Sequence, residues 1–349
     1  MVRTTAIMTY RSLGDAPRDP MHVRRASGGS EATEPAGRGP TFPDSALVLF
    51  PGALGDFICF LPTLCALRAR HAGPIRLVAK AALLELIRLP GLDAASIDRR
   101  EIADLFAAGP LHAETAALCG GFTSVHSWTG FGSPEFARRV AALGAPAVSV
   151  YPFRGMQFGE HAADYYARCV ALPAQPIVPS VLCQDDQWLD TFRRRHALGE
   201  RAMVVLHPGS GSRRKNWQGF ADLACRWRQR YADALVVLHG PAEIDAPISD
   251  AIDAIPVTGR SLPQVAALLA HSALYVGNDS GISHLAGAVA ARGAVLFGPS
   301  DPTCWAPRTG ALHVLQAAEP CRQCGPETFC VHRLPVERVI EALERLRPV

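Results

Sequence analysis

Short apolar runs alternate with segments of helical periodicity across residues 46–347. The first strand–helix pairs are predicted at 46–50 with 57–70 and at 76–79 with 81–88. Because strand and helix alternate at this pitch, the pattern predicts a parallel β-sheet with helices on both faces. The first series continues with predicted strands at 124–126 and 147–150 and predicted helices at 133–143 and 160–170.

The alternation is interrupted once, by a stretch at 171–180 that contains three prolines and suits a linker between domains. The pattern then starts again. Its predicted strands are 203–207, 234–240, 256–258, 273–276, 294–297 and 312–315, and its predicted helices are 184–196, 220–230, 262–271, 286–291 and 335–346. We therefore expect an α/β protein with domains at 44–180 and 181–334, followed by a C-terminal helical segment at 335–349.

Residues 1–43 lack this pattern and are rich in Arg, Gly, Ser, Pro and Glu. A chain of this composition cannot bury enough apolar surface to fold, so we expect a disordered tail. The alternative is that the true start of the protein lies downstream.

Composition narrows the classes of function. The 349 residues are 48% hydrophobic with a net charge of +3, so charge gives no reason to expect a nucleic-acid partner. The apolar runs are shorter than the roughly 20 residues of a membrane span, and the N-terminus lacks a signal-peptide core. Ten cysteines in this length do not suggest a disulfide scaffold. We expect a cytoplasmic protein; the basic run 193–195 indicates a solvated helix face, with an anionic membrane surface as the alternative.

The stretch at 276–287 predicts a strand–loop–helix junction, because it follows an apolar run and precedes small residues. Asn278, Asp279, Ser280 and Gly281 are residue types that cap helices and allow tight turns. The N–H groups and the dipole of the following helix would form a site for an anion such as phosphate. The alternative is an ordinary capped helix without a ligand.

A second junction follows the first strand, where Gly52 and Gly55 frame a loop that ends in Asp56. Glycines let the backbone turn tightly and approach a ligand. Asp56 stands where the next helix is predicted to begin, so a functional carboxylate and a simple helix cap are both open. Capping would explain the aspartate but not the paired glycines.

A third junction follows the strand at 203–207, where Ser210, Gly211 and Ser212 precede Lys215. Open N–H groups and a lysine can cradle a phosphate, although the spacing is not that of a P-loop and no NTPase is predicted. Since open α/β sheets bind ligands at the carboxyl ends of their strands, the cleft between the domains is the expected active site.

These loops resemble those of glycosyltransferase family 9, the ADP-heptose:lipopolysaccharide heptosyltransferases. The resemblance implies a GT-B fold: two Rossmann-like domains with a cleft between them, acceptor on the N-terminal domain and nucleotide sugar on the C-terminal domain. It also implies that the last helix crosses back to the N-terminal domain. The matching blocks, whose order and spacing fit over 46–347, are 52–56 with 61–64, 207–210 with 215–217, and 277–281 with 284–286, 296–299 and 305–307.

The resemblance implies roles for individual residues. Asp56 matches the catalytic aspartate of an inverting transfer that requires no metal, and Glu243 falls near the acidic residue associated with the ribose or base. For His284, ligand contact and a structural hydrogen bond are both open. The substrate- and nucleotide-binding set is Gly52, Gly55, Ser210, Gly211, Ser212, Lys215, Glu243, Asp279, Ser280, Gly281, Ile282 and His284.

The chain departs from the family pattern in three places and also by its long N-terminal tail. Gln218 stands where a proline often follows the tryptophan, Ile282 stands where many members have proline, and 290–294 lacks a common proline. These departures affect the prediction of the donor sugar more than the prediction of the fold.

The residues also suggest a mechanism. An acceptor hydroxyl must lose its proton as it attacks the anomeric carbon, and Asp56 is the candidate base. The leaving nucleoside diphosphate gains negative charge, which the helix N–H groups at Ser280 and Gly281 and the cation of Lys215 can stabilise. Neither cleft loop carries an Asp-x-Asp pair, so we expect no metal and no cofactor.

The expected function is transfer of heptose from ADP-heptose to a lipopolysaccharide-core or related cell-envelope acceptor, lipid-linked or oligosaccharide. Contact with the cytoplasmic face of the inner membrane would suit such an acceptor. The alternatives are a transferase or epimerase that uses another nucleotide sugar, and a nucleotide-sugar-binding protein that has lost catalysis. The presence of Asp56 and Lys215 argues against the last.

One cysteine group stands apart from these motifs. Cys321 and Cys324, with Cys330 and His332 nearby, offer four side chains of the kind that bind zinc. Ligands this crowded in one loop are less typical than two separated pairs, so reduced cysteines in a surface loop are the favoured interpretation.

Overall fold

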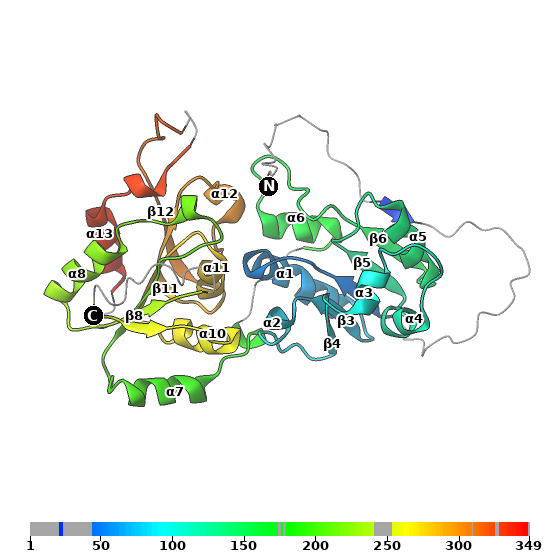
Figure 1. Cartoon of the computed structure of the whole chain (residues 1–349), viewed down its shortest axis with the longest axis horizontal. Helices are drawn as coiled ribbons and strands as arrows, with labels where there is room; N and C mark the ends of the chain where they lie inside the picture. The colour runs from blue at the N-terminus through cyan, green and yellow to red at the C-terminus, as the bar shows by residue number, and fades with distance from the viewer. Residues whose placement is uncertain are drawn as a thin grey trace, which may run out of the picture.

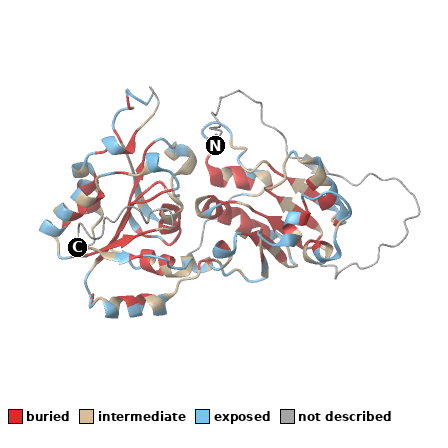
Figure 2. Ribbon diagram, viewed as in Figure 1, coloured by how far each residue is buried: buried red, intermediate tan, exposed pale blue. Residues whose placement is uncertain are grey.

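Two α/β domains lie side by side along the long axis of the molecule (Figure 1). The computed structural model describes residues 21–23, 44–173, 176, 179–240, 253–308, 310–324 and 328–347. Each domain is built on one six-stranded sheet, and the buried residues follow the two sheets and the helix faces that cover them (Figure 2). The predicted pair of α/β domains is thus confirmed.

The N-terminal sheet has the strand order β1-β6-β5-β2-β3-β4, and its strands are parallel except for β1. Residues of β2 alternate between the two faces: Val48 joins one core, and Leu47 and Leu49 join the other. This alternation is what a strand buried on both faces requires. The strands are β1 (Met21–Val23), β2 (Ala46–Leu49), β3 (Ile75–Ala79), β4 (Leu92–Ser96), β5 (Ser124–Ser127) and β6 (Ala147–Val150).

Helices cover both faces of this sheet. On the first face α1 and α6 pack together around a cluster of aromatic rings, in which Phe50 stacks on Phe60 at 4.3 Å between ring centroids. The other face is covered by α3, α4 and α5. The helices are α1 (Leu54–Arg70), α2 (Ala81–Leu84), α3 (Arg100–Asp104), α4 (Ala113–Cys119), α5 (Pro134–Ala142) and α6 (Ala162–Cys169).

The C-terminal sheet is wholly parallel, with the order β12-β11-β10-β7-β8-β9. One face packs on α8 and α13, and the other on α10 and α11. The strands are β7 (Met203–His207), β8 (Ala234–Leu238), β9 (Ile255–Val257), β10 (Leu274–Asn278), β11 (Arg292–Phe297) and β12 (Ala311–Gln316). The helices are α7 (Asp186–Arg195), α8 (Phe220–Arg230), α10 (Leu262–Ala270), α11 (Gly281–Ala288), α12 (Pro302–Trp305) and α13 (Val336–Leu346), with 3₁₀ turns at η1 (Pro179–Val181), η2 (Arg213–Lys215) and η3 (Val331–Arg333).

The last helix, α13, packs on its own domain, so the expectation that it crosses back to the N-terminal domain is wrong. Its apolar face is buried with α8 and the β11 side of the sheet through Val339, Ile340 and Leu343. Arg226 and Arg230 of α8 pair with Glu337 and Glu344 of α13. Figure 1 shows the two helices together at the end of the molecule far from the N-terminal domain.

Other differences from the sequence predictions are local. The strand β4 and the short helices α3 and α4 were not predicted. The strand was missed because it is a largely exposed edge strand with the mixed sequence Leu-Asp-Ala-Ala-Ser. The strand β1, inside the tail expected to be disordered, pairs with β6; the rest of 1–43 lies outside the described residues. Among the described helices, none is both long and apolar enough to cross a membrane.

The linker stays close to the N-terminal domain before the second domain begins. The N–H of Cys183 donates to the carbonyl of Leu86 at 2.7 Å, and Leu182 forms an isolated antiparallel β-bridge with Ile87. The second domain therefore begins at α7, which packs against α10, a few residues after the predicted boundary.

Candidate active site

The N-termini of α1 and α11 meet at the interface between the domains. A Cβ built on Gly281 would lie 2.9 Å from Cβ of Leu54 and 3.0 Å from N of Gly55, so only a glycine allows this approach. Each helix follows a strand in the middle of its sheet, β2 or β10. Because a helix N-terminus carries partial positive charge, two such ends brought together favour an anion between the domains.

Asp56 lies in the first turn of α1 and is not its cap. The cap position is Ala53, because the helix begins at Leu54 rather than at the predicted residue 57. Asp56 is only 6% exposed, and a Cβ on Gly52 would lie 2.8 Å from its Cβ. The turn therefore needs glycine at position 52, and the interpretation of Asp56 as a simple cap is wrong.

The partner of Asp56 is Arg154, which the sequence analysis did not identify. Its Nη2 lies 3.3 Å from both carboxylate oxygens of Asp56. The guanidinium also lies 5.4 Å from the ring centre of Phe153 and 5.5 Å from that of Trp305, which belongs to the C-terminal domain. Arg154 thus connects the Asp56 carboxylate to the opposite domain while its own side chain stays 59% exposed.

On the C-terminal side, Lys215 pairs with Asp279 across the 3₁₀ turn η2 and the end of β10. Their Nζ and Oδ2 atoms are 2.7 Å apart, and the carboxylate is buried. Asn278 fastens the same two segments, because its amide donates to the carbonyl of Pro208 at 2.6 Å and accepts from the N–H of Trp217 at 3.0 Å. The structure therefore brings together two of the predicted donor-binding loops.

In the loop of small residues at 210–212, Ser210 makes hydrogen bonds within the loop, and the two residues after it are exposed. Its hydroxyl lies 2.6 Å from Oδ1 of Asn216 and accepts from the N–H of Ser212 at 3.2 Å. Gly211 and Ser212 are exposed, and a Cβ on Gly211 would meet open space. The hydrogen bonds of Ser210 thus hold the loop in shape, with Gly211 and Ser212 at the surface.

The start of α11 contributes packing and capping. Ser280 is the N-cap, and its hydroxyl accepts from the N–H of Ser283 at 3.3 Å. Ile282 is half-buried and packs against the core. His284 is 5% exposed, with Nδ1 3.6 Å from Sγ of Cys59 on α1. Burial lowers the pKa of His284 to about 4, so it is neutral at pH 7 and makes the structural contact that had been one of its two expected roles.

The carboxylates of Asp56 and Asp279 both act on the buried thiol of Cys59 on α1. Burial raises the pKa of the Cys59 thiol to about 12, and the negative charges of Asp56 and Asp279 add to the rise. Arg308 opposes it. Asp56 of one domain and Asp279 of the other therefore both lie near the meeting point of α1 and α11.

Two further contacts across the interface were not predicted. Nε2 of His161 lies 2.8 Å from the carbonyl oxygen of Ala306, and its Nδ1 accepts from the N–H of Ala163 at 3.1 Å. Burial lowers the pKa of His161, so the neutral ring donates from Nε2. Arg308 pairs with Asp164 at 2.6 Å. These contacts connect the segment after α12 to α6.

Glu243, which was assigned to the donor site, lies outside the described residues.

Comparisons with known proteins extend this description. Residues 160–330 match the model of glycosyltransferase family 9 (heptosyltransferase). The curated "Lipopolysaccharide heptosyltransferase 3" of Escherichia coli (strain K12) is 30% identical over 182 residues, which cover 47% of this chain and 52% of that protein. The match thus spans about half the length of the curated relative.

Two solved structures share the fold over most of the chain. The glycosyl transferase family 9 structure from Veillonella parvula DSM 2008 has a TM-score of 0.70 at 20% identity, covering 87% of this chain and 97% of that one. The E. coli ADP-heptose lps heptosyltransferase II has a TM-score of 0.63 at 20% identity, covering 86% and 98%. The fold is that of the GT-B glycosyltransferases, as predicted. Over residues 160–330 the sequence is similar to glycosyltransferase family 9, and over most of its length the chain shares the fold of solved members of that family.

Proposed function

We propose that this protein is an inverting glycosyltransferase that moves heptose from ADP-heptose to a lipopolysaccharide-core or related cell-envelope acceptor. The observation that carries the proposal is the meeting of α1 and α11, with Asp56 on one side and the Lys215–Asp279 pair on the other. The match to the family model supports the class of reaction, and the names of the two E. coli relatives support the sugar and the acceptor.

The donor diphosphate binds on the C-terminal domain. The start of α11 supplies N–H groups and the positive end of a helix dipole, and the exposed Gly211 supplies a further N–H donor. Lys215 already bonds to Asp279, but an ammonium has three donors and keeps two for phosphate oxygens. Glu243 contacts the ribose or the base.

Asp56 acts as the general base toward the acceptor hydroxyl. Its carboxylate is held on the first turn of α1, where Nη2 of Arg154 lies 3.3 Å from both of its oxygens. The hydroxyl oxygen attacks the anomeric carbon as its proton passes to Asp56, and the bond to the diphosphate breaks on the opposite side. The configuration at the anomeric carbon is therefore inverted.

The leaving diphosphate is stabilised by the protein's own charges. Negative charge builds on it during bond breaking, where Lys215 and the N-terminus of α11 lie. This arrangement supplies the stabilisation that a divalent ion gives in other transferases, so we propose a reaction without a metal or cofactor. The enzyme works in the cytoplasm, where it meets its acceptor at the inner membrane surface.

A donor panel tests the proposal. The purified protein is incubated with ADP-heptose, UDP-glucose or GDP-mannose, with and without lipopolysaccharide acceptor extracted from heptose-deficient cells. We expect ADP release that depends on the acceptor, and a product heavier by one heptose in mass spectrometry. Transfer only from a donor other than ADP-heptose would support a transferase that uses another nucleotide sugar. Isomerisation of a donor without acceptor would indicate an epimerase. Binding of a donor without turnover would indicate a protein that has lost catalysis.

A further inference from the structure

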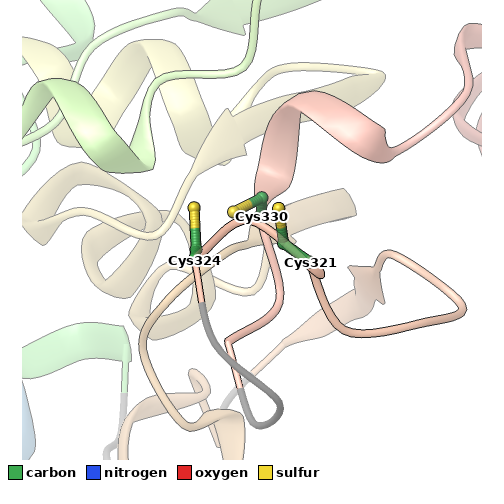
Figure 3. A group of neighbouring side chains, drawn as sticks. All are labelled: Cys321, Cys324 and Cys330. Carbon is green, nitrogen blue, oxygen red and sulfur yellow. The ribbon is translucent and has the colours of Figure 1, made fainter.

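Three cysteine side chains converge in the segment between β12 and α13. The sulfur atoms of Cys321, Cys324 and Cys330 all lie within 4.8 Å of one another (Figure 3). Cys321 and Cys330 are buried and Cys324 is exposed. The proposed transfer reaction uses none of them, and none belongs to the junction of α1 and α11.

The spacing of the sulfur atoms fits a metal ion better than a disulfide. Zinc binds thiolates at about 2.3 Å in a tetrahedron, which places neighbouring sulfurs roughly 3.8 Å apart. Contraction by about 1 Å would therefore bring all three onto one ion. A disulfide would draw two sulfurs to about 2.0 Å and leave the third thiol without a function.

The backbone around Cys321 forms a hydrogen-bonded turn. The N–H of Cys324 donates to the carbonyl of Cys321 at 3.1 Å, and the N–H of Cys321 donates to the carbonyl of Thr328 at 2.6 Å. These two hydrogen bonds hold the backbone that carries Cys321 and Cys324, so that it positions two of the three side chains that would bind an ion.

We propose that Cys321, Cys324 and Cys330 bind one thiophilic transition-metal ion, of which Zn²⁺ is the reference case. Three protein ligands leave a fourth tetrahedral position, and the exposed Cys324 places it toward solvent. His332 is exposed on η3, close in sequence to Cys330, and is the side chain available to move onto the fourth position.

The ion has a structural role that reaches the donor loop. The buried indole N–H of Trp217 donates to the carbonyl of Leu334 at 2.9 Å, and Val331 packs against Gly298 at the end of β11. The segment that follows Cys330 therefore supports Trp217, whose own N–H is bound by Asn278 of the donor site. Fixing Cys330 through an ion would hold this segment in place.

Metal analysis of the full chain tests the proposal. Wild type, Cys321→Ser, Cys330→Ser and the control Cys225→Ser, an exposed cysteine on α8, are purified without chelator and measured by elemental analysis. We expect about one ion per chain in wild type and the control, and several-fold less in the other two variants. An ion content that is the same in all four proteins would overturn the proposal.

A second measurement covers variants that fail to fold. Wild type is stripped with a chelator under reducing conditions and titrated with Zn²⁺ while the melting temperature and the thiol reactivity are followed. We expect Zn²⁺ to raise the melting temperature and to protect three thiols from a thiol reagent. Full reactivity in excess Zn²⁺, or a mass two units lower that reveals a disulfide in the protein as isolated, would contradict metal binding.

Discussion

The charged residues of the site are held by partners from distant parts of the chain. Asp56 and Arg154 are 98 positions apart, and Lys215 and Asp279 are 64 apart. Sequence reasoning found Asp56, Lys215 and Asp279 because each follows a strand in a loop with small residues. It could not find Arg154, because a lone arginine in an irregular loop carries no pattern and its partner is brought to it only by the fold.

Removal of the Lys215 side chain should weaken donor binding. Lys215→Ala loses a charged hydrogen bond to phosphate and leaves the buried carboxylate of Asp279 facing an anion. We expect ADP to bind about 10- to 100-fold more weakly in calorimetry, equivalent to about 1.5–3 kcal/mol. Adding Asp279→Asn should recover part of the loss, because the repulsion is removed. An unchanged ADP affinity in Lys215→Ala would exclude this residue from the donor site.

His284 should make the protein less stable in mild acid. Its pKa of about 4 in the folded state lies below the usual 6.5, so the unfolded chain binds the proton first and stability falls as pH drops from about 6.5 toward 4. We expect His284→Gln to remove a slope of up to about 1.4 kcal/mol per pH unit. Urea unfolding at pH 7 and pH 5 measures it.

Other histidines with a lowered pKa limit how much acid sensitivity the His284→Gln variant can lose. The pKa of His126 is lowered by burial to about 4, and that of His161 is lowered by burial. Because both are still present in the His284→Gln variant, its stability will still fall to some extent at acidic pH. Equal pH dependence of wild type and His284→Gln would show that His284 is not neutral in the folded protein.

At the scale of elements, strongly apolar strands and long amphipathic helices were predictable. The strands β2, β7, β10 and β11 are apolar runs buried on both faces, and α13 concentrates its apolar residues on one side. The prediction failed for β4, an edge strand, because its two exposed residues, Asp93 and Ala94, are charged or small and interrupt any apolar run. It also failed for the docking of α13, since the partner of an apolar helix face is decided by tertiary packing.

Three helices of the N-terminal domain depend on one buried ion pair. Arg139 of α5 bonds to Asp104 of α3, which also accepts from Thr115 of α4 at 2.7 Å. Arg139→Met would leave the buried carboxylate with its hydrogen bonds to Thr115 and His112 but without the buried guanidinium. We expect a loss of about 3–5 kcal/mol in unfolding free energy, measured by urea titration.

The neighbouring arginine is a matched control for that experiment. Arg138 lies on the same helix and pairs with Glu135, but its side chain is exposed. We expect Arg138→Met to change the unfolding free energy by less than about 1 kcal/mol. If both variants lost the same stability, burial of the Arg139 pair would not be the cause.

At the scale of the whole molecule, the site exists only where the two domains meet. Asp56 and Arg154 come from the N-terminal domain, and Lys215, Asp279 and Trp305 come from the C-terminal domain. The two-domain fold could be predicted from the interrupted alternation of strands and helices. The closeness of α1 and α11 could not, because it depends on two glycines, Gly55 and Gly281, that meet across the interface.

Transfer should persist without free divalent ions. In the proposed mechanism Lys215 and the start of α11 supply the positive charge that the leaving diphosphate needs, so a brief exposure to excess EDTA should leave the rate within about twofold. The ion content of the cysteine group is measured in the same sample, so that loss of a structural ion is recognised. Activity abolished by EDTA and restored by Mg²⁺ or Mn²⁺ would contradict the proposed chemistry.

The central claim is that one domain supplies the base and the other binds the donor. Asp56→Asn tests it most directly, since asparagine keeps the size of the side chain but cannot accept the proton as a carboxylate does. Turnover with ADP-heptose and acceptor is measured beside ADP affinity and melting temperature. We predict turnover lower by about 10²–10⁴-fold, with ADP affinity unchanged. Near-normal turnover by a well-folded Asp56→Asn protein would contradict the account.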